Sequence, residues 1–93
     1  MTDTAKPTYI LDNERVRVGD WSMAPDTKIG DHTHEHDYLV IGVSEGELVV
    51  VVGEDDINFP VAPGVTVFGS KGDTHDVVNR ADGEVRFLEI DLK

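Results

Sequence analysis

The sequence predicts an all-β protein. Short runs rich in Val, Ile, Phe and Tyr are separated at close intervals by turn residues, which is typical of a protein built from sheets with tight connections. No apolar stripe with the period of a helix appears over any length, and nine glycines and four prolines would interrupt one. A chain of 93 residues is long enough for one domain only, so we expect a single domain over 1–93.

Eight segments carry the strand pattern. The connections between them place Gly or Asp where a positive φ is wanted, or Pro where a turn is preset, as in Ala62-Pro63-Gly64. Residues 1–8 carry no such pattern, so we expect a loose N-terminus unless a partner strand captures it. In chain order the expected strands are 9–11, 15–21, 37–43, 47–52, 57–60, 66–68, 74–79 and 85–92.

Two of these segments indicate how the strands pack. Segment 15–18 alternates arginine with valine, as expected of a strand that has one face in water. Segment 48–52 is apolar throughout, so we expect both of its faces to be covered, either by a second sheet or by a subunit contact.

The last segment, 85–92, predicts a homodimer. One of its faces carries Leu88, Ile90 and Leu92, while Val85 and Phe87 occupy the other. A terminal strand that is apolar on both sides favours burial against a second copy of the chain, so we expect an isologous contact there.

The charge of the chain excludes two classes of partner. Nineteen acidic residues against eight basic ones give a formal net charge of −11. Because nucleic acid and anionic lipid surfaces are themselves negative, we expect neither nucleic acid nor membrane as a partner. No apolar run approaches the roughly 18 residues of a membrane span and 1–6 is polar, so we expect a cytoplasmic protein. Cysteine is absent, so a transition metal would need imidazole and oxygen ligands.

Three of the four histidines occupy alternate positions, at His32, His34 and His36. On an extended segment such side chains face the same way about 6.7 Å apart, so two of them can lean onto one ion but three in a straight row cannot. The fourth, His75, begins another apolar segment, and facing positions in a sheet could bring it to the pair. The histidines therefore predict a metal site, although solvated side chains in an acidic loop would explain the first three alone.

The residues around His75 resemble the second of the two motifs of the cupin superfamily. That motif is matched by Gly64, by Ser70 in the position of its proline, and by Gly72, His75 and Asn79. Serine loses the preset φ of proline but is still a turn-forming residue. We expect Asn79 to fix backbone near His75 rather than to bind an ion.

The first cupin motif is matched more loosely. Its two histidines correspond to His32 and His34, and the position of its leading glycine holds Asp26. Aspartate visits the left-handed region more readily than most residues, so this replacement is minor. The glutamate position falls on Tyr38 or the residue after it, which means that the carboxylate ligand usual in metal-binding cupins is missing.

The resemblance implies a cupin jelly-roll β-barrel of the small single-domain bacterial kind, with a divalent transition metal on His32, His34 and His75. Three-histidine cupins similar to this pattern include dioxygenases that use ferrous iron, so iron is favoured, with zinc, manganese and nickel as alternatives. Neutral imidazoles leave the charge of the ion uncompensated, so the site should favour a small anionic ligand such as a carboxylated metabolite.

Two more residues are candidates for catalytic roles beside the ion. We expect Tyr38 to hydrogen-bond bound water or substrate, because its unperturbed pKa of about 10 resists its use as a ligand. His36 is expected at the rim as a proton carrier, although either residue could join the ion directly. The protein would then be a metal-dependent enzyme, and the alternative is a non-catalytic binding or sensor domain of the same fold. Each arginine could clamp a substrate carboxylate, but a surface ion pair is its expected role.

Overall fold

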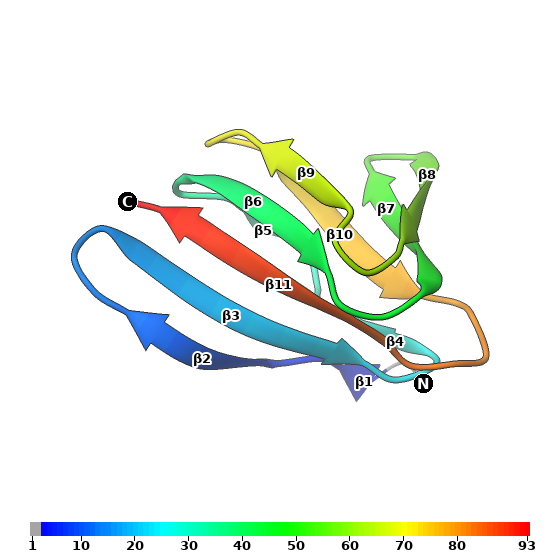
Figure 1. Cartoon of the computed structure of the whole chain (residues 1–93). Helices are drawn as coiled ribbons and strands as arrows, with labels where there is room; N and C mark the ends of the chain where they lie inside the picture. The colour runs from blue at the N-terminus through cyan, green and yellow to red at the C-terminus, as the bar shows by residue number, and fades with distance from the viewer. Residues whose placement is uncertain (1–2) are drawn as a thin grey trace.

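Eleven strands form two facing sheets in the computed structural model, which describes residues 3–93 (Figure 1). One sheet has the order β1-β4-β10-β7-β8, with β5 also paired to β10, and the other has the order β2-β3-β11-β6-β9. We name them the β10 sheet and the β11 sheet after the strands at their centres. The strands are β1 (Asp3–Thr4), β2 (Pro7–Asp12), β3 (Val16–Met23), β4 (Thr27–Lys28), β5 (His32–Thr33), β6 (Asp37–Gly42), β7 (Gly46–Val52), β8 (Asp55–Val61), β9 (Thr66–Gly69), β10 (Thr74–Asn79) and β11 (Val85–Leu92).

The all-β prediction is confirmed, and each of the eight expected segments is a strand with small differences at its ends. The three strands that were not predicted, β1, β4 and β5, have two residues each, which is too short for a periodic pattern to appear. The sequence predicts a loose N-terminus unless a partner strand captures it, and for residues 3–8 that exception applies. β1 pairs in parallel with β4, and β2 already begins at Pro7, so partner strands capture this segment; residues 1–2 lie outside the described residues.

The hydrophobic core lies between the two sheets. Phe87 stacks on Trp21 at a ring-centroid distance of 6.1 Å, which joins β11 to β3 on the inner side of their sheet. In β7, Leu48 is fully buried while Val49 and Val51 are only partly buried, so within one chain the apolar segment is covered on one face rather than two. The buried core residues are Met23, Leu48, Val61, Val77, Val85 and Phe87.

Strand β3 faces the opposite way from its prediction. Val18 is registered with Ile90 on the outer face, whereas Arg17 points inward and reaches Asp91. Alternation divides a strand into two faces but does not say which of them meets the interior. Here the interior at this end of the barrel is polar, because β11 also turns its acidic residues inward there.

The outer face of the β11 sheet is apolar along one complete row. Five residues, one from each strand, are direct neighbours in register: Leu11, Val18, Ile90, Leu39 and Phe68. The two end members are well exposed, Leu11 at 49% and Phe68 at 60%. A single chain therefore leaves a continuous apolar band in water, which is a feature of contact surfaces.

Two motif positions do what their residue types suggest. Asp26 has a φ of 62°, which confirms that it can stand in the left-handed region where the motif has glycine. Asn79 is fully buried, and its amide donates to the carbonyl oxygens of Met23 at 2.8 Å and Gly83 at 3.0 Å. Asn79 thus fixes backbone as expected, but at the far end of β10 from His75.

Candidate metal centre

Three histidines meet at one end of the barrel because short strands bring their backbones together. β5 pairs with β10 so that His32 lies directly opposite His75. Two residues later the backbone of His34 is held by the turn before β10: its N–H donates to the carbonyl of Asp73, and its own carbonyl accepts from the N–H of Gly72, each at 2.9 Å. The register of these pairs converges all three imidazoles on one point.

The geometry of the three rings suits a metal ion. Nε2 of His34 lies 3.1 Å from Nε2 of His32 and 3.1 Å from Nε2 of His75, and all three atoms lie within 4.8 Å of one another. Two nitrogens bound to one ion at about 2.1 Å and at right angles are about 3.0 Å apart. Three nitrogens at this spacing could occupy adjacent positions around a single ion.

The tautomer of His32 is set by the backbone. Its Nδ1 lies 2.7 Å from the carbonyl oxygen of Gly30, and since a carbonyl only accepts, Nδ1 carries the proton. The lone pair of Nε2 then faces the other two rings. Holding the second nitrogen of a ligand histidine by a backbone carbonyl is a common feature of metal sites.

Burial favours the neutral form of His34 and His75, which is the form that binds metal. His34 is only 8% exposed. Its burial, with the nearby His32 and His75, lowers the pKa of His34 to about 4. Burial is also the main cause that lowers the pKa of His75.

Tyr38 fixes the ring of His34 from behind. The two rings stack with centroids 3.7 Å apart and planes 15° from parallel, and the Tyr38 hydroxyl donates to Asp73 at 3.2 Å. Burial, followed by the charge of Asp73, raises the pKa of Tyr38, so the phenol keeps its proton. On the other side of the ring is Gly69, where an added Cβ would come within 2.0 Å of a Tyr38 carbon. The expected bond from Tyr38 to bound water or substrate stays a prediction.

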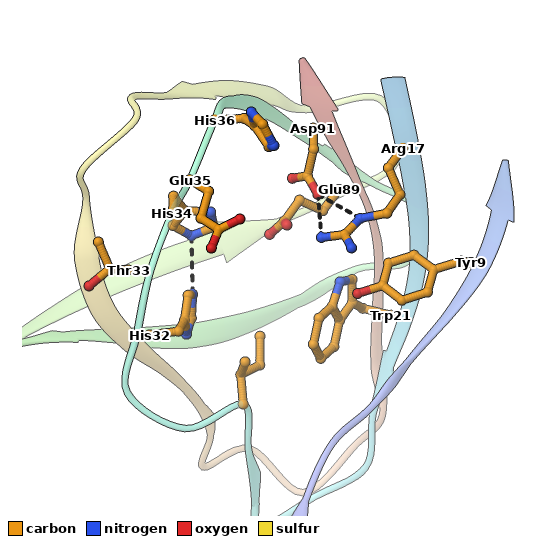
Figure 2. A pocket seen from close by; sticks show the side chains of 11 residues that line it. Tyr9, Arg17, Trp21, His32, Thr33, His34, Glu35, His36, Glu89 and Asp91 are labelled. Atoms are coloured by element: carbon orange, nitrogen blue, oxygen red, sulfur yellow. Dashed lines mark hydrogen bonds and ion pairs between the residues drawn. The ribbon is translucent and has the colours of Figure 1, made fainter. Parts of the chain in front are cut away.

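His36 is not part of the three-histidine cluster. It is half-buried and lines the pocket in front of the cluster, and Figure 2 shows it at the top of that pocket, on the side of Asp91 and away from His32. This position suits the rim location expected from the sequence. Its role as a proton carrier stays a prediction.

The histidines stand between two cavities. The larger has a volume of about 370 Å³ and a lining of mixed polarity, and the smaller, of about 180 Å³, lies between the sheets and is mainly apolar. Both cavities are bordered by His32 and Glu89. We call the larger one the mouth pocket; it is lined by Tyr9, Arg17, Trp21, Ile29, His32, Thr33, His34, Glu35, His36, Glu89 and Asp91.

A carboxyl group reaches the site from β11, a strand that the sequence analysis did not connect with the metal site. Glu89 and Asp91 lie on the inner face of β11, and oxygen atoms of both lie within 4.8 Å of each other and of a ring nitrogen of His34. Figure 2 shows the Glu89 carboxyl directed from β11 toward the histidines. The site therefore has carboxyl groups beside it, although no carboxylate stands at the glutamate position of the first motif.

The environment of Glu89 favours its neutral form. Its burial, its hydrogen bond with Asp91 and the charge of Asp91 together raise the pKa of Glu89 to about 8, against the opposite effect of Arg17. A carboxyl that keeps its proton near neutral pH is able to donate a hydrogen bond into the pocket.

This raised pKa predicts how the stability of the metal-free protein depends on pH. Folded Glu89 binds a proton that the unfolded chain releases near pH 4.5, so stability should fall as pH rises from about 5 to 8. Because Glu89→Gln mimics the protonated form, the gain in stability of this variant over the wild type should grow across that interval in denaturant melts. The exposed pocket residue Glu35, changed to Gln, is the matched control and should show a constant difference; a constant difference for Glu89→Gln too would contradict the expectation.

Arg17 forms an ion pair, as the sequence indicated, but with the buried Asp91 on the wall of the mouth pocket and not on the outer surface. Its Nε and Nη2 atoms donate to the same Asp91 oxygen at 3.1 and 2.9 Å, and its guanidinium lies 4.5 Å from the centre of the Tyr9 ring. The correction follows from the orientation of β3. Two other arginines form exposed pairs, Arg80 just after β10 with Asp56 and Arg86 of β11 with Asp20.

Sequence reasoning missed the contributions of β2, β3 and β11 to the pocket. One signal was available on β11. The apolar inner positions Val85 and Phe87 continue into Glu89 and Asp91, so two acids fall on the face that elsewhere builds the core. Charged residues on a core-facing period are rare unless they line a site.

Comparisons with known proteins agree with this architecture. Residues 19–91 match the family model described as a cupin domain. The β-alanine degradation protein BauB of Pseudomonas aeruginosa is 37% identical over 89 residues, which is 96% of this chain and 94% of that protein. The crystal structure of a cupin domain from Bordetella pertussis superposes with a TM-score of 0.94 at 34% identity, covering 100% of this chain and 97% of the other.

A more distant structural neighbour carries a name that includes an activity. It is a sugar phosphate isomerase of the cupin superfamily from Silicibacter pomeroyi, with a TM-score of 0.66 and 27% identity over 86% of this chain and 52% of its own.

Within residues 3–93, no helix is long and apolar enough to cross a membrane.

Proposed function

This chain belongs to the cupin superfamily and has its jelly-roll fold, and from that premise we propose that it is a metal-dependent enzyme acting on a small carboxylated metabolite. One divalent transition metal would be held by His32, His34 and His75. Substrate would enter the mouth pocket, where it can reach the open side of the ion.

The observation that carries the proposal is the convergence of the three Nε2 atoms, at 3.1 Å contacts, on the wall of an open pocket. Three adjacent imidazole ligands leave the remaining positions of an ion free for water or substrate, as catalytic sites require. A bound ion would supply a Lewis acid and, in the case of iron, a centre for oxygen chemistry.

Two arguments support a small carboxylated substrate. Three neutral ligands leave the charge of a divalent ion uncompensated, which favours an anionic ligand. The relative BauB is named for degradation of β-alanine, a small carboxylated molecule. The mouth pocket, with a volume of about 370 Å³, is large enough to admit such a molecule.

The reaction we favour is that of an iron-dependent dioxygenase, in which both atoms of O₂ enter the substrate and no external reductant is consumed. The chain would contribute the protons and orientation. His36 at the rim is the group proposed to carry a proton to or from the pocket, and Tyr38 is proposed to assist bound water or substrate.

Elemental analysis tests the proposal directly. Protein purified without chelator and without nickel affinity resin should contain about one transition-metal ion per chain. Iron-loaded protein should consume oxygen with small amino and hydroxy acids such as β-alanine. If metal is absent while small carboxylates still bind, and bind equally well to His75→Ala, the protein is instead a binding or sensor domain.

We also propose that the chain is a homodimer formed by the outer face of the β11 sheet. The apolar row from Leu11 to Phe68 crosses all five strands, and Ile90 of the central strand lies at its middle. A second copy related by a two-fold axis would cover this band with the same band.

Sedimentation at micromolar concentration should give a dimer for the wild type and a monomer for Ile90→Asp. The matched control is Val49→Asp, which places the same charge on the outer face of the other sheet and should leave the dimer intact. A monomeric wild type would overturn the proposed contact.

A further inference from the structure

The wall of the mouth pocket opposite the histidines carries three hydrogen-bond donors that bond to nothing in the described part of the chain. They are the Nη1 amino group of Arg17, the indole N–H of Trp21 and the hydroxyl of Tyr9, and all three residues line the pocket. Among the described residues that are not exposed, which include Arg17 and Trp21, every buried polar side-chain atom has a partner, and Tyr9 is 51% exposed, so all three unpartnered donors are accessible. Figure 2 shows the Tyr9 oxygen and the Trp21 nitrogen turned toward the middle of the pocket, below Arg17.

The three donors are held in place by contacts on their far sides. Asp91 takes two hydrogen bonds from Arg17 on one oxygen, and the Tyr9 ring covers the guanidinium at 4.5 Å, so the direction of Nη1 is set. The indole of Trp21 is fixed by its stack on Phe87. Because these side chains are already ordered, little conformational entropy is lost when a ligand binds them.

We propose that Arg17, Trp21 and Tyr9 form a carboxylate-binding subsite that anchors one end of the ligand while its other end faces His32, His34 and His75. This inference rests on the proposed function for the identity of the reacting end. The subsite itself needs only the geometry of β2, β3 and β11. Arg17, Trp21 and Tyr9 are then the residues that determine specificity for the acid group.

The charges around the wall favour a carboxylate over a dianion such as phosphate. Asp91 neutralises Arg17, and Glu89 also borders the pocket, so the wall has little net positive charge. Recognition therefore depends on directed hydrogen bonds. A planar carboxylate can use its two oxygens to accept from the guanidinium and from the neutral indole and phenol donors at once.

The single tryptophan of the chain provides the test, because its indole N–H gives one unambiguous cross-peak in a ¹H–¹⁵N NMR spectrum. The protein is titrated in its metal-free form, in which no ion can bind the anions directly, with propionate, with propionamide and with inorganic phosphate. Propionate should move the indole cross-peak in a saturable manner, and propionamide and phosphate should bind roughly tenfold more weakly or not at all.

Variants locate the effect. Arg17→Gln should weaken propionate binding at least about tenfold, and Tyr9→Phe about threefold. The control is Arg86→Gln, which removes an arginine with the same two-bond pairing to an aspartate on the outer face and should bind propionate as the wild type does. If Arg17→Gln does not fold, the propionate affinities of Tyr9→Phe, by NMR, and of Trp21→Phe, by calorimetry, test the subsite instead. Equal affinity of these variants and Arg86→Gln, or a response to phosphate alone, overturns the subsite.

The same titration separates this inference from the proposed function. In His75→Ala the Arg17-dependent shift with propionate should persist, since the donors do not involve the ion. If the wild type binds no metal but shows that shift, the metal-dependent function fails and the subsite stands. If metal is bound and the indole does not respond to any carboxylate, the subsite fails alone.

Discussion

His75→Ala is expected to lower the bound metal from about one ion per chain to less than about a tenth. Two imidazoles remain, and loss of a direct ligand should weaken binding by more than the roughly 10- to 100-fold typical of changes behind the ligands. The shift in unfolding temperature that added zinc or iron produces should disappear with it. Elemental analysis after gel filtration and thermal melts with and without metal measure both effects.

The matched control for this change is His36→Ala. It removes a histidine that lines the mouth pocket beside His32 and His34 and shares their alternation along the chain, but that lies outside the three-histidine cluster. Its metal content should equal that of the wild type. Loss of metal in both variants would mean that His36 joins the ion, and unchanged metal in His75→Ala would show that the ion binds elsewhere.

Gly69→Ala is expected to disturb the fold and the metal site together. An alanine Cβ at this position would lie 2.0 Å from the nearest Tyr38 carbon, and the ring behind it is held against His34 at 3.7 Å. The ring must therefore move toward or away from the histidine, at a cost of about 1–3 kcal/mol for an overpacked site. We expect lower stability in denaturant melts and metal affinity weaker by roughly tenfold.

Gly83→Ala is the control, since an added Cβ there meets nothing within 4 Å. It should change neither stability nor metal affinity appreciably. If Gly69→Ala lost stability but bound metal as the wild type does, Tyr38 would support the fold without positioning His34.

Much of the fold was accessible from the sequence because its signals are local. Alternating and continuous apolar runs marked the eight longer strands, and turn residues marked their ends. The dependence on local signals also explains why three strands were not predicted. β1, β4 and β5 exist only because a neighbouring strand pairs with them, and a segment of two residues carries no pattern that predicts such a pairing.

The candidate site was accessible only in part. His32 and His34 could be paired with His75 through the resemblance of the spacing, and the structure brings the three together. Arg17 could not be placed, because its position depends on which face of β3 looks inward, whereas the alternation of β11 carried a signal for Glu89 that the prediction did not use. In β3 the face that looks inward is the one that carries Arg17, and the face that carries Val18 looks outward.

The sequence by itself determined that this is an all-β chain with three histidines able to meet at one point, because strand periodicity and motif spacing depend on residues that are close together in the chain. Only the tertiary structure decided what surrounds that point. The carboxyl of Glu89 comes from β11, and the donors of Arg17 and Trp21 come from β3, so both lie far from His34 in the chain. Their convergence is set by sheet register and by the facing of β3 and β11, which are properties of the packed barrel.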